Sequence, residues 1–335
     1  MKILFITHVN EKNLFPNDIM NDCVLHGLKQ VYGNSNVIDY PGAWHMYNEE
    51  VNKRNFSYKN FWGNGFTYYD NLNNYENVDR NDIENKIKNN FFNYIVYGSV
   101  TRSQLFLNEA INSKSKIILI DGEDHINLDF NKHKKIIYFK RELTEDINNV
   151  FPINVTIPKS KIINKINLKP KTLLAPLIPH RYKTYIYKNE ADYYYMWQDS
   201  IFGISYVHGG WWEAVRYYEM LMNGCIPLIP ELKKCPKNTL TLLPKDNLIN
   251  LFNKYSWILN QYFPLNIYKK KFLSLSKLFL YLKNLHKKKY NGLSFIEEFE
   301  EVNEARQYLV DYTRKYLTTE YSAKKIIETT DKFYS

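Results

Sequence analysis

The sequence predicts an α/β protein built on mostly parallel sheets. Short apolar runs alternate with segments of helical period, which is the rhythm of strand–helix–strand units. Two runs, NYIVYG at 93–98 and KIILID at 116–121, are continuously apolar, as in strands that are buried on both faces of a parallel sheet. The 335 residues are 44% hydrophobic, which is enough to build cores and excludes wholesale disorder.

The first half supplies the elements of one such sheet. MKILFIT predicts the first strand, and NDIMNDCVLHGLKQVYG predicts a helix with Asn17 or Asp18 as its N-cap and Gly33 at its end. NVIDY predicts a second strand. TRSQLFLNEAINS predicts a helix between the two apolar strands, and KKIIYFK at 134–140 predicts another strand.

Two segments interrupt this alternation. Residues 41–80 are aromatic and rich in Gly and Asn, and they are too apolar for a linker. We expect them to form a long loop packed near the functional end of the sheet. Residues 150–172 are rich in Pro and Lys and have weak periodicity, which predicts a domain boundary. We therefore expect an N-terminal domain over 1–158 and a C-terminal domain over 172–335.

The second half repeats the alternation. A helix near 190–199 precedes the strand IFGISYV, and the stretch HGGWWEAVRYYEMLMNGCIPLIP at 208–230 combines a helix with the strand CIPLIP. The chain from 294 onward is strongly helical. This order predicts two Rossmann-like domains that face a central cleft, followed by a helical C-terminus. Such folds bind ligands at the carboxyl ends of their strands.

The formal net charge of +10 favours an anionic partner, and nucleotide, nucleic acid, phospholipid and acidic glycan all fit. Part of the excess lies in 267–290, where apolar residues stand between lysine triplets. That pattern is typical of a basic amphipathic helix on an anionic membrane. It is also typical of a helix that packs one face on the core and carries lysines at its ends.

Cysteine usage and hydropathy indicate the compartment. The three cysteines form no C-x-x-C pair, so we expect a reducing environment. The N-terminal apolar run is too short for the core of a signal peptide, and no stretch approaches the roughly 18 apolar residues of a transmembrane helix. We therefore expect a cytoplasmic protein, with peripheral membrane contact through 267–290 left open.

The stretch that begins HGGWW has the features of an anion site. Gly209 and Gly210 precede a helix, where unpaired backbone N–H groups and the helix dipole attract phosphate. Arg216 and Glu219 stand three residues apart on one face of that helix. Arg offers a fork of donors for phosphate, and ionised Glu accepts hydrogen bonds from hydroxyl groups such as those of a ribose.

An ordinary ion pair on the helix surface is the alternative interpretation of Arg216 and Glu219. Four aromatic residues stand beside this pair in the sequence: Trp211, Trp212, Tyr217 and Tyr218. They favour partial burial of Arg216 and Glu219, and buried charges need partners. Gly224 stands where a residue with positive φ is expected just after the helix.

The segment S-x-F-G-x-S…G-G-W…R-Y-Y-E-x-L-x-N-G-C-I-P resembles the donor-binding part of GT-B glycosyltransferases. It is most similar to the spore-maturation-type and exostosin-like branch, in which R-x-x-E-x-x-x-x-G-x-x-P recurs. The resemblance implies that Glu219 binds the ribose of a nucleotide sugar and that Arg216 holds its phosphates. H-G-G-W is also similar to the UDP-glycosyltransferase signature, although the Glu follows the His sooner there. That similarity implies further donor-binding residues: His208, Gly209, Gly210 and Trp211.

The same resemblance implies that the acceptor and any catalytic base lie at strand ends of the N-terminal half. His8 directly follows the first strand in FITHVN, and in several inverting GT-B enzymes a His at this point deprotonates the acceptor hydroxyl. A pKa of about 6.5 suits His to that task at neutral pH.

The crowded carboxylates of DGEDH are the second candidate. They suit a base, sugar hydroxyls or a divalent ion, the last of which would indicate a GT-A enzyme. We assign Asp121 and Asp124 as candidate bases and Glu123 to the acceptor. GT-B enzymes need no metal, so we expect neither a metal nor a cofactor besides the donor.

Two further strand ends carry basic residues. Lys140 and Arg141 in YFKREL suit the donor phosphate or a salt-bridged edge, and we assign Ser99 and Arg102 in GSVTRS to the acceptor. GSVTRS lacks the G-x-G-x-x-G spacing of a nicotinamide site. No G-x-S-x-G, H-E-x-x-H, P-loop or kinase motif is present, so nothing supports a hydrolase or phosphotransferase.

These observations predict a metal-independent glycosyltransferase that moves a sugar from a nucleotide-diphosphate sugar to a hydroxyl acceptor. The acceptor class stays open among glycan, lipid, protein and modified nucleic acid. Two alternatives also stay open. One is a nucleotide-sugar epimerase on the same fold, and the other is a catalytically inactive, basic GT-B-like binding module.

Overall fold

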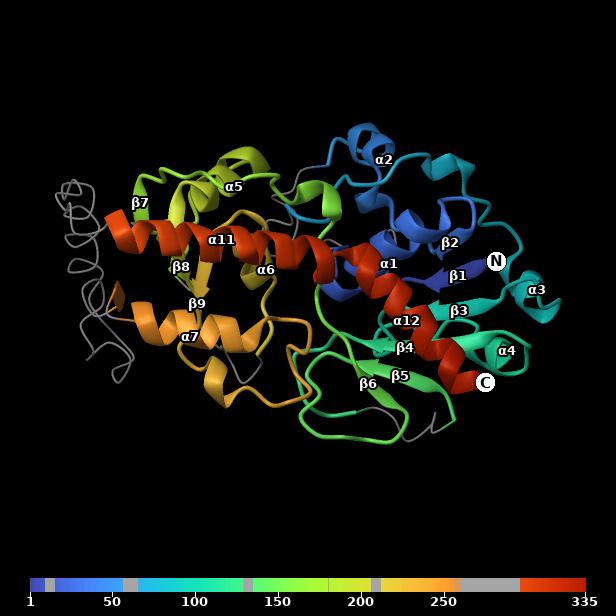
Figure 1. Ribbon diagram of the computed structural model, residues 1–335. Helices are drawn as coiled ribbons and strands as arrows, with labels where there is room; N and C mark the ends of the chain where they lie inside the picture. The colour runs from blue at the N-terminus through green and yellow to red at the C-terminus, as the bar shows by residue number, and fades with distance from the viewer. Residues whose placement is uncertain are drawn as a thin grey trace.

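The computed structural model describes residues 1–9, 16–56, 66–128, 135–179, 181–205, 212–256, 258–259 and 296–335. Over these residues the chain forms two parallel sheets (Figure 1). One has six strands in the order β2-β1-β3-β4-β5-β6, and the other has three in the order β7-β8-β9. The predicted α/β class with parallel sheets and a helical C-terminus is confirmed.

The six-stranded sheet is built from short apolar runs. Its strands are β1 (Ile3–Ile6), β2 (Val37–Tyr40), β3 (Tyr94–Tyr97), β4 (Lys116–Asp121), β5 (Ile137–Lys140) and β6 (Val150–Pro152). All adjacent pairs are parallel. Alternate side chains point to opposite faces, so Ile3 and Phe5 pack in one core and Leu4 and Ile6 in another. The first five strands confirm the prediction from the apolar runs.

Helices cover both faces of this sheet. α1 (Ile19–Tyr32) and α12 (Thr319–Tyr334) pack on one face, and α3 (Ile83–Lys88) and α4 (Leu107–Ile111) pack on the other. The ends of α1 lie where the sequence predicts them. The Asp18 side chain accepts a hydrogen bond from the backbone N–H of Asn21 at 3.0 Å, and Gly33 follows the helix with a φ of +88°.

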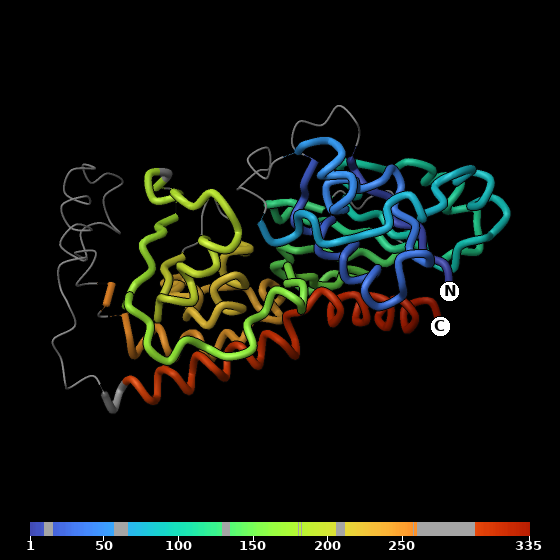
Figure 2. Tube along the Cα trace, turned by 90° about the horizontal axis from the view of Figure 1, so that it is seen from above, coloured from blue at the N-terminus to red at the C-terminus, as the bar shows by residue number. Residues whose placement is uncertain are grey.

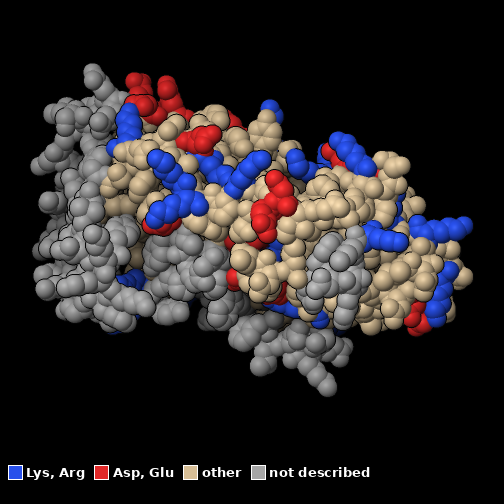
Figure 3. Space-filling view, turned by 90° about the horizontal axis from the view of Figure 1, so that it is seen from below, with Lys and Arg blue, Asp and Glu red and all other residues tan. Residues whose placement is uncertain are grey.

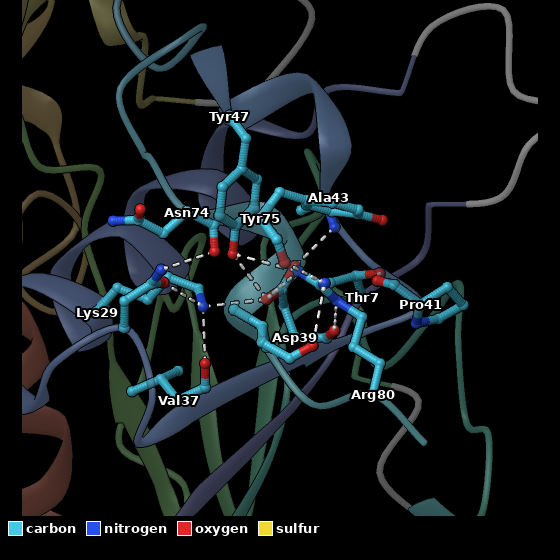
Figure 4. A network of polar contacts seen from close by, with 12 residues as sticks. Thr7, Lys29, Val37, Asp39, Pro41, Ala43, Tyr47, Asn74, Tyr75 and Arg80 are labelled. Carbon is cyan, nitrogen blue, oxygen red and sulfur yellow. Dashed lines mark hydrogen bonds and ion pairs between the residues drawn. The ribbon is translucent and has the colours of Figure 1, made fainter. Parts of the chain in front are cut away.

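The aromatic insertion is anchored to the end of β2 by a buried polar network. The insertion contains α2 (Asn48–Lys53) and 3-10 helices at Trp44–Met46 and Tyr75–Asn77. Lys29 and Arg80 reach the fully buried Asp39 from two sides, each at 3.0 Å, and the Tyr47 hydroxyl donates to it at 2.8 Å (Figure 4). Burial alone raises the pKa of Asp39, but the charges of Lys29 and Arg80 outweigh burial and lower it to about 2.

The second half holds the smaller sheet. Its strands are β7 (Thr172–Leu174), β8 (Ser200–Ile204) and β9 (Ile226–Leu228), and its helices include α5 (Glu190–Gln198), α6 (Val215–Met222) and α7 (Lys245–Tyr255). The predicted helix near 190–199, the strand after it and the helix–strand pair after 212 are confirmed. Gly224 has a φ of +70°, as predicted for the residue that ends the α6 helix.

Two terminal helices join the halves. α11 (Ile296–Tyr316) packs along α6, where the guanidinium of the fully buried Arg306 donates to the carbonyl of Gly224 at 2.6 Å. The chain then crosses to the six-stranded sheet, and α12 packs against α1 (Figure 2). Both termini therefore lie at the far end of the first half (Figure 1).

Charge is mixed on one face of the molecule. On the face shown in Figure 3, Lys and Arg side chains stand among Asp and Glu side chains and form no single basic patch there. None of the described helices is long and apolar enough to cross a bilayer. Segment 267–290, whose pattern fits either a membrane-binding helix or a helix packed on the core, lies outside the described residues. An anionic partner for the +10 charge therefore stays a prediction.

Candidate functional site

A pocket of about 250 Å³ lies where the carboxyl ends of strands from both sheets meet. The first half contributes the start of α1, the aromatic insertion, and the residues just after β4 and β5. The second half contributes Tyr193 on α5, the residues from Glu213 to Arg216 at the start of α6, and Glu219 on that helix. Three of the predicted donor-binding residues, Arg141, Arg216 and Glu219, therefore line the same pocket.

Glu219 is buried and held by two hydroxyl groups. Its side chain is 6% exposed, in agreement with the burial predicted from the surrounding aromatic residues. Thr67 donates to Oε1 at 2.6 Å and Tyr193 donates to Oε2 at 2.6 Å. Burial raises the pKa of Glu219, and both hydrogen bonds oppose that rise. Each carboxylate oxygen has a second lone pair, so the group can still accept from a ligand hydroxyl.

Arg216 and Arg141 bring two positive charges to the pocket. Arg216 donates to the Tyr185 hydroxyl at 2.9 Å, and its guanidinium lies over the Tyr185 ring. Arg141 directly follows β5, is 7% exposed, and pairs with Asp124. In each arginine the Nε atom is buried and has no hydrogen-bond partner within the described residues. An anion in this pocket would satisfy both groups.

Asp121 and Lys140 are both fully buried and form a 2.9 Å ion pair with each other. Tyr138 donates to the second oxygen of Asp121 at 2.7 Å. Neither residue lines the pocket. The roles predicted from sequence, a base for Asp121 and a phosphate ligand for Lys140, need contact with substrate. Because each charge already neutralises the other inside the sheet, we leave both out of the proposed mechanism.

The predicted acceptor residues form a separate cluster. Arg102 pairs with Glu123 at 2.9 Å and with Asp18 at 2.9 Å, and Ser99 is buried in the turn after β3. Burial raises the pKa of Glu123, but its contacts with Arg102 outweigh that effect and lower it. None of Arg102, Glu123 and Ser99 lines the pocket. The structure thus joins Arg102 to Glu123, and their contact with an acceptor stays a prediction.

His8 follows β1, as predicted, and is half-buried. Burial lowers its pKa, and the raising effects of Asp18 and Asp22 do not reverse the shift. A lowered pKa keeps His8 neutral at pH 7, which is the form that accepts a proton. His8 is not itself among the residues that line the pocket.

The sequence analysis missed an Asp–His pair that does line the pocket. His45, in the aromatic insertion, lies 3.0 Å from Asp22 on α1, measured from Nε2 to Oδ2. Both side chains are buried, with 1% and 2% exposed. The two residues are far apart in sequence, and no local spacing indicates that they meet.

Glu213 was also missed. It lines the pocket and is 2% exposed. Its Oε1 accepts from the backbone N–H of Val155 at 3.1 Å, from the Asn154 amide at 3.2 Å and from Tyr218. Burial raises the pKa of Glu213 to about 7. The signal in the sequence was its position between the H-G-G-W turn and the Arg216 helix, since a charge there needs a partner or a function.

The predicted phosphate-binding turn, His208 to Trp211, lies outside the described residues. The next residues are held by the first half, because the backbone N–H groups of Trp212 and Glu213 donate to the buried carboxylate of Glu142 at 3.0–3.1 Å. The described residues contain no cluster of three or more His, Cys, Asp or Glu side chains that could hold a metal ion.

Comparison with known sequences adds no assignment. No protein family matches the chain, and no curated protein matches it in sequence. The function proposed below therefore depends on the residues and on the geometry of the pocket.

Proposed function

We propose that the protein is a GT-B-type glycosyltransferase that transfers a sugar from a nucleotide-diphosphate sugar to a hydroxyl acceptor. In this proposal residues 1–158 and 172–335 act as acceptor and donor domains on either side of the pocket. The observation that carries the proposal is the position of Arg216 and Glu219, the R-x-x-E pair, in one pocket with Arg141 from the opposite half. Two guanidinium groups with unpartnered Nε atoms suit a diphosphate, and a buried carboxylate suits a ribose.

Catalysis would depend mainly on stabilising the leaving group. The acceptor oxygen attacks the anomeric carbon, and the bond from that carbon to the diphosphate oxygen breaks. The electron pair leaves on the diphosphate, where Arg141 and Arg216 stabilise it. The acceptor proton passes to a base that the first half supplies. His8 is the first candidate because its lowered pKa keeps it neutral, and Asp124 in the pocket is the second.

A thermal-shift panel of nucleoside diphosphates and nucleotide sugars tests the donor site. A ligand that binds only the native state stabilises it by about 2.7 kcal/mol at a hundredfold excess over Kd, so a true donor raises the Tm. Glu219→Gln should lose most of that shift. Glu231→Gln, which changes a half-exposed side chain away from the pocket, should keep it. No shift with any nucleotide at millimolar concentration would overturn the proposal.

Product analysis separates the other functions. Incubating the stabilising nucleotide sugar without acceptor should leave it unchanged, whereas isomerisation of the sugar would identify an epimerase. DNA binding that collapses with salt, together with no nucleotide binding, would identify a basic binding module.

A further inference from the structure

We infer that Glu213 binds the donor diphosphate in its protonated form, as a third donor beside Arg141 and Arg216, so that ligand binding takes up a proton. The inference rests on the proposed function in taking the anion to be a diphosphate. It concerns a residue that neither the sequence motif nor its resemblance singled out.

The hydrogen bonds of Glu213 decide which oxygen carries the proton. Oε1 faces three donors: the Val155 backbone N–H, the Asn154 amide and the Tyr218 hydroxyl. The orientation of Asn154 is determined, because its Oδ1 accepts from Thr241 at 2.7 Å and from the Leu242 N–H at 3.1 Å. Its amide N–H group must therefore point to Glu213. Oε1 has no place for a proton, and Oε2 is the oxygen that can carry one.

Oε2 is buried, and the residues that the structure describes provide neither a donor nor an acceptor for it. The Nε atoms of Arg141 and Arg216 are in the same condition, and all three side chains line one pocket. Three unpartnered buried polar groups around one space indicate a ligand that accepts hydrogen bonds from all of them. A phosphate oxygen does so when Oε2 carries a proton.

The charges around Glu213 favour proton uptake when an anion binds. Arg141 and Glu142 after β5 act in opposite directions, because Arg141 lowers the pKa of Glu213 and Glu142 raises it. Tyr68, Tyr217, Tyr218, Cys23 and Cys235 also face Glu213, and burial raises their pKa values, so they stay neutral at pH 7. A bound diphosphate offsets the charge of Arg141 and adds its own negative charge, and both effects raise the pKa of Glu213 further.

The pKa of Glu213 sets the pH range in which ligand binding takes up a proton. Free Glu213 has a pKa of about 7. Below about pH 6 it is already protonated and binding takes up nothing, whereas near pH 7 binding takes up about half a proton per molecule. Affinity that requires the protonated form falls about tenfold between pH 6 and pH 8. Glu213→Gln keeps an amide donor at every pH, so its affinity should not follow this fall.

Inorganic pyrophosphate is the probe, and titration calorimetry in two buffers of different ionisation enthalpy counts the protons. Free pyrophosphate titrates in this pH range too, identically in every experiment, so we compare wild type with Glu213→Gln rather than use either value alone. We expect wild type to take up about half a proton more than Glu213→Gln at pH 7. Glu231→Gln, which changes a half-exposed carboxylate away from the pocket, should keep the wild-type uptake.

Equal uptake by wild type and Glu213→Gln overturns the inference, as does an equal loss of uptake in Glu231→Gln. Failure of pyrophosphate to bind wild type also overturns it.

If Glu213→Gln does not fold, Tyr218→Phe decides, because losing that donor raises the pKa of Glu213 and moves the pH of the affinity change upward. A Tyr218→Phe variant with the same pH dependence of pyrophosphate affinity as wild type would overturn the inference. Pyrophosphate binding with proton uptake at Glu213, but no nucleotide binding, would leave the inference standing and overturn the proposed function.

Discussion

At the scale of single residues, Glu219 links the two halves of the chain through hydrogen bonds. Thr67 comes from the aromatic insertion of the first half and Tyr193 from α5 of the second. Both hydroxyls are buried with the carboxylate, so water does not replace either bond. Glu219, which we expect to bind the ribose, therefore also connects the two walls of the pocket.

Replacing Thr67 with Val removes one of these donors and keeps the shape of the side chain. A hydrogen bond to a charged group contributes about 1.5–3 kcal/mol, and we expect T67V to lower the free energy of unfolding by that amount. Thr101→Val is the matched control, because its partner Glu123 is 23% exposed and water can take the place of the hydroxyl. Urea unfolding measures both variants, and equal losses would contradict the expectation.

Asp39 makes stability depend on acid pH. Its pKa falls from 3.8 to about 2 on folding, so the carboxylate stabilises the fold above pH 3.8, and that contribution is lost as the pH falls toward 2. We expect about 2 kcal/mol of the free energy of unfolding to disappear over this window. Urea unfolding at stepped pH should show this loss in wild type and not in Asp39→Asn. Parallel pH curves for the two proteins would rule it out.

At the scale of secondary-structure elements, the contact of α1 with α12 closes one face of the large sheet. Gly27 on α1 lies directly against the backbone of α12, where an added Cβ would stand 2.1 Å from the carbonyl oxygen of Thr319. Close by, His26 Nδ1 lies 2.8 Å from the Thr319 hydroxyl oxygen. The two helices can approach this closely because residue 27 has no side chain.

Gly27→Ala should therefore destabilise the protein although alanine favours helices. Backbone atoms cannot move aside cheaply, and overpacking of this kind costs about 1–3 kcal/mol. Gln30→Ala, an exposed position on α1, should change stability by less than about 0.5 kcal/mol. Thermal unfolding of the two variants measures the difference. A Gly27→Ala variant as stable as Gln30→Ala would show that α12 is not tightly packed on α1.

The sequence indicates less clearly those strands that form only because a neighbouring strand pairs with them. β1 to β5 are apolar runs that carry their own pattern. β6 begins in the Pro- and Lys-rich segment 150–172 and β7 begins at its end, where the pattern is weak. β6 is a strand because β5 offers it a hydrogen-bonding edge, and β7 because β8 does. A local pattern cannot indicate such an edge.

At the scale of the whole molecule, the first half depends on the last helix of the chain. α12 buries Ala323, Ile326 and Ile327 in the core on the α1 face of the six-stranded sheet. Ile157, at the end of the first half, also pairs with Thr318 just before α12. Residues before and after the predicted boundary at 150–172 therefore pack together.

Residues 1–158 expressed alone should lack a cooperative unfolding transition. Each isoleucine removed with α12 accounts for roughly 1.5–3 kcal/mol of apolar burial, which is a large share of a typical domain's stability. Circular dichroism melting and size-exclusion chromatography of the fragment beside the full chain measure this. A fragment that is monomeric and melts cooperatively at the temperature of the full chain would show that α12 is dispensable for the first half.

The sequence by itself determined the parallel α/β class, the ends of α1 at Asp18 and Gly33, and the turn at Gly224. These features depend on local periodicity and on backbone preferences of single residues. Only the tertiary structure decided which charged residues face the pocket. It pairs Asp121 with Lys140 inside the sheet and brings unpredicted side chains to the pocket, among them Asp22, His45 and Glu213. The physical reason is that a charged side chain is neutralised only where a partner distant in sequence meets it. No local pattern specifies which charged residues have such a partner.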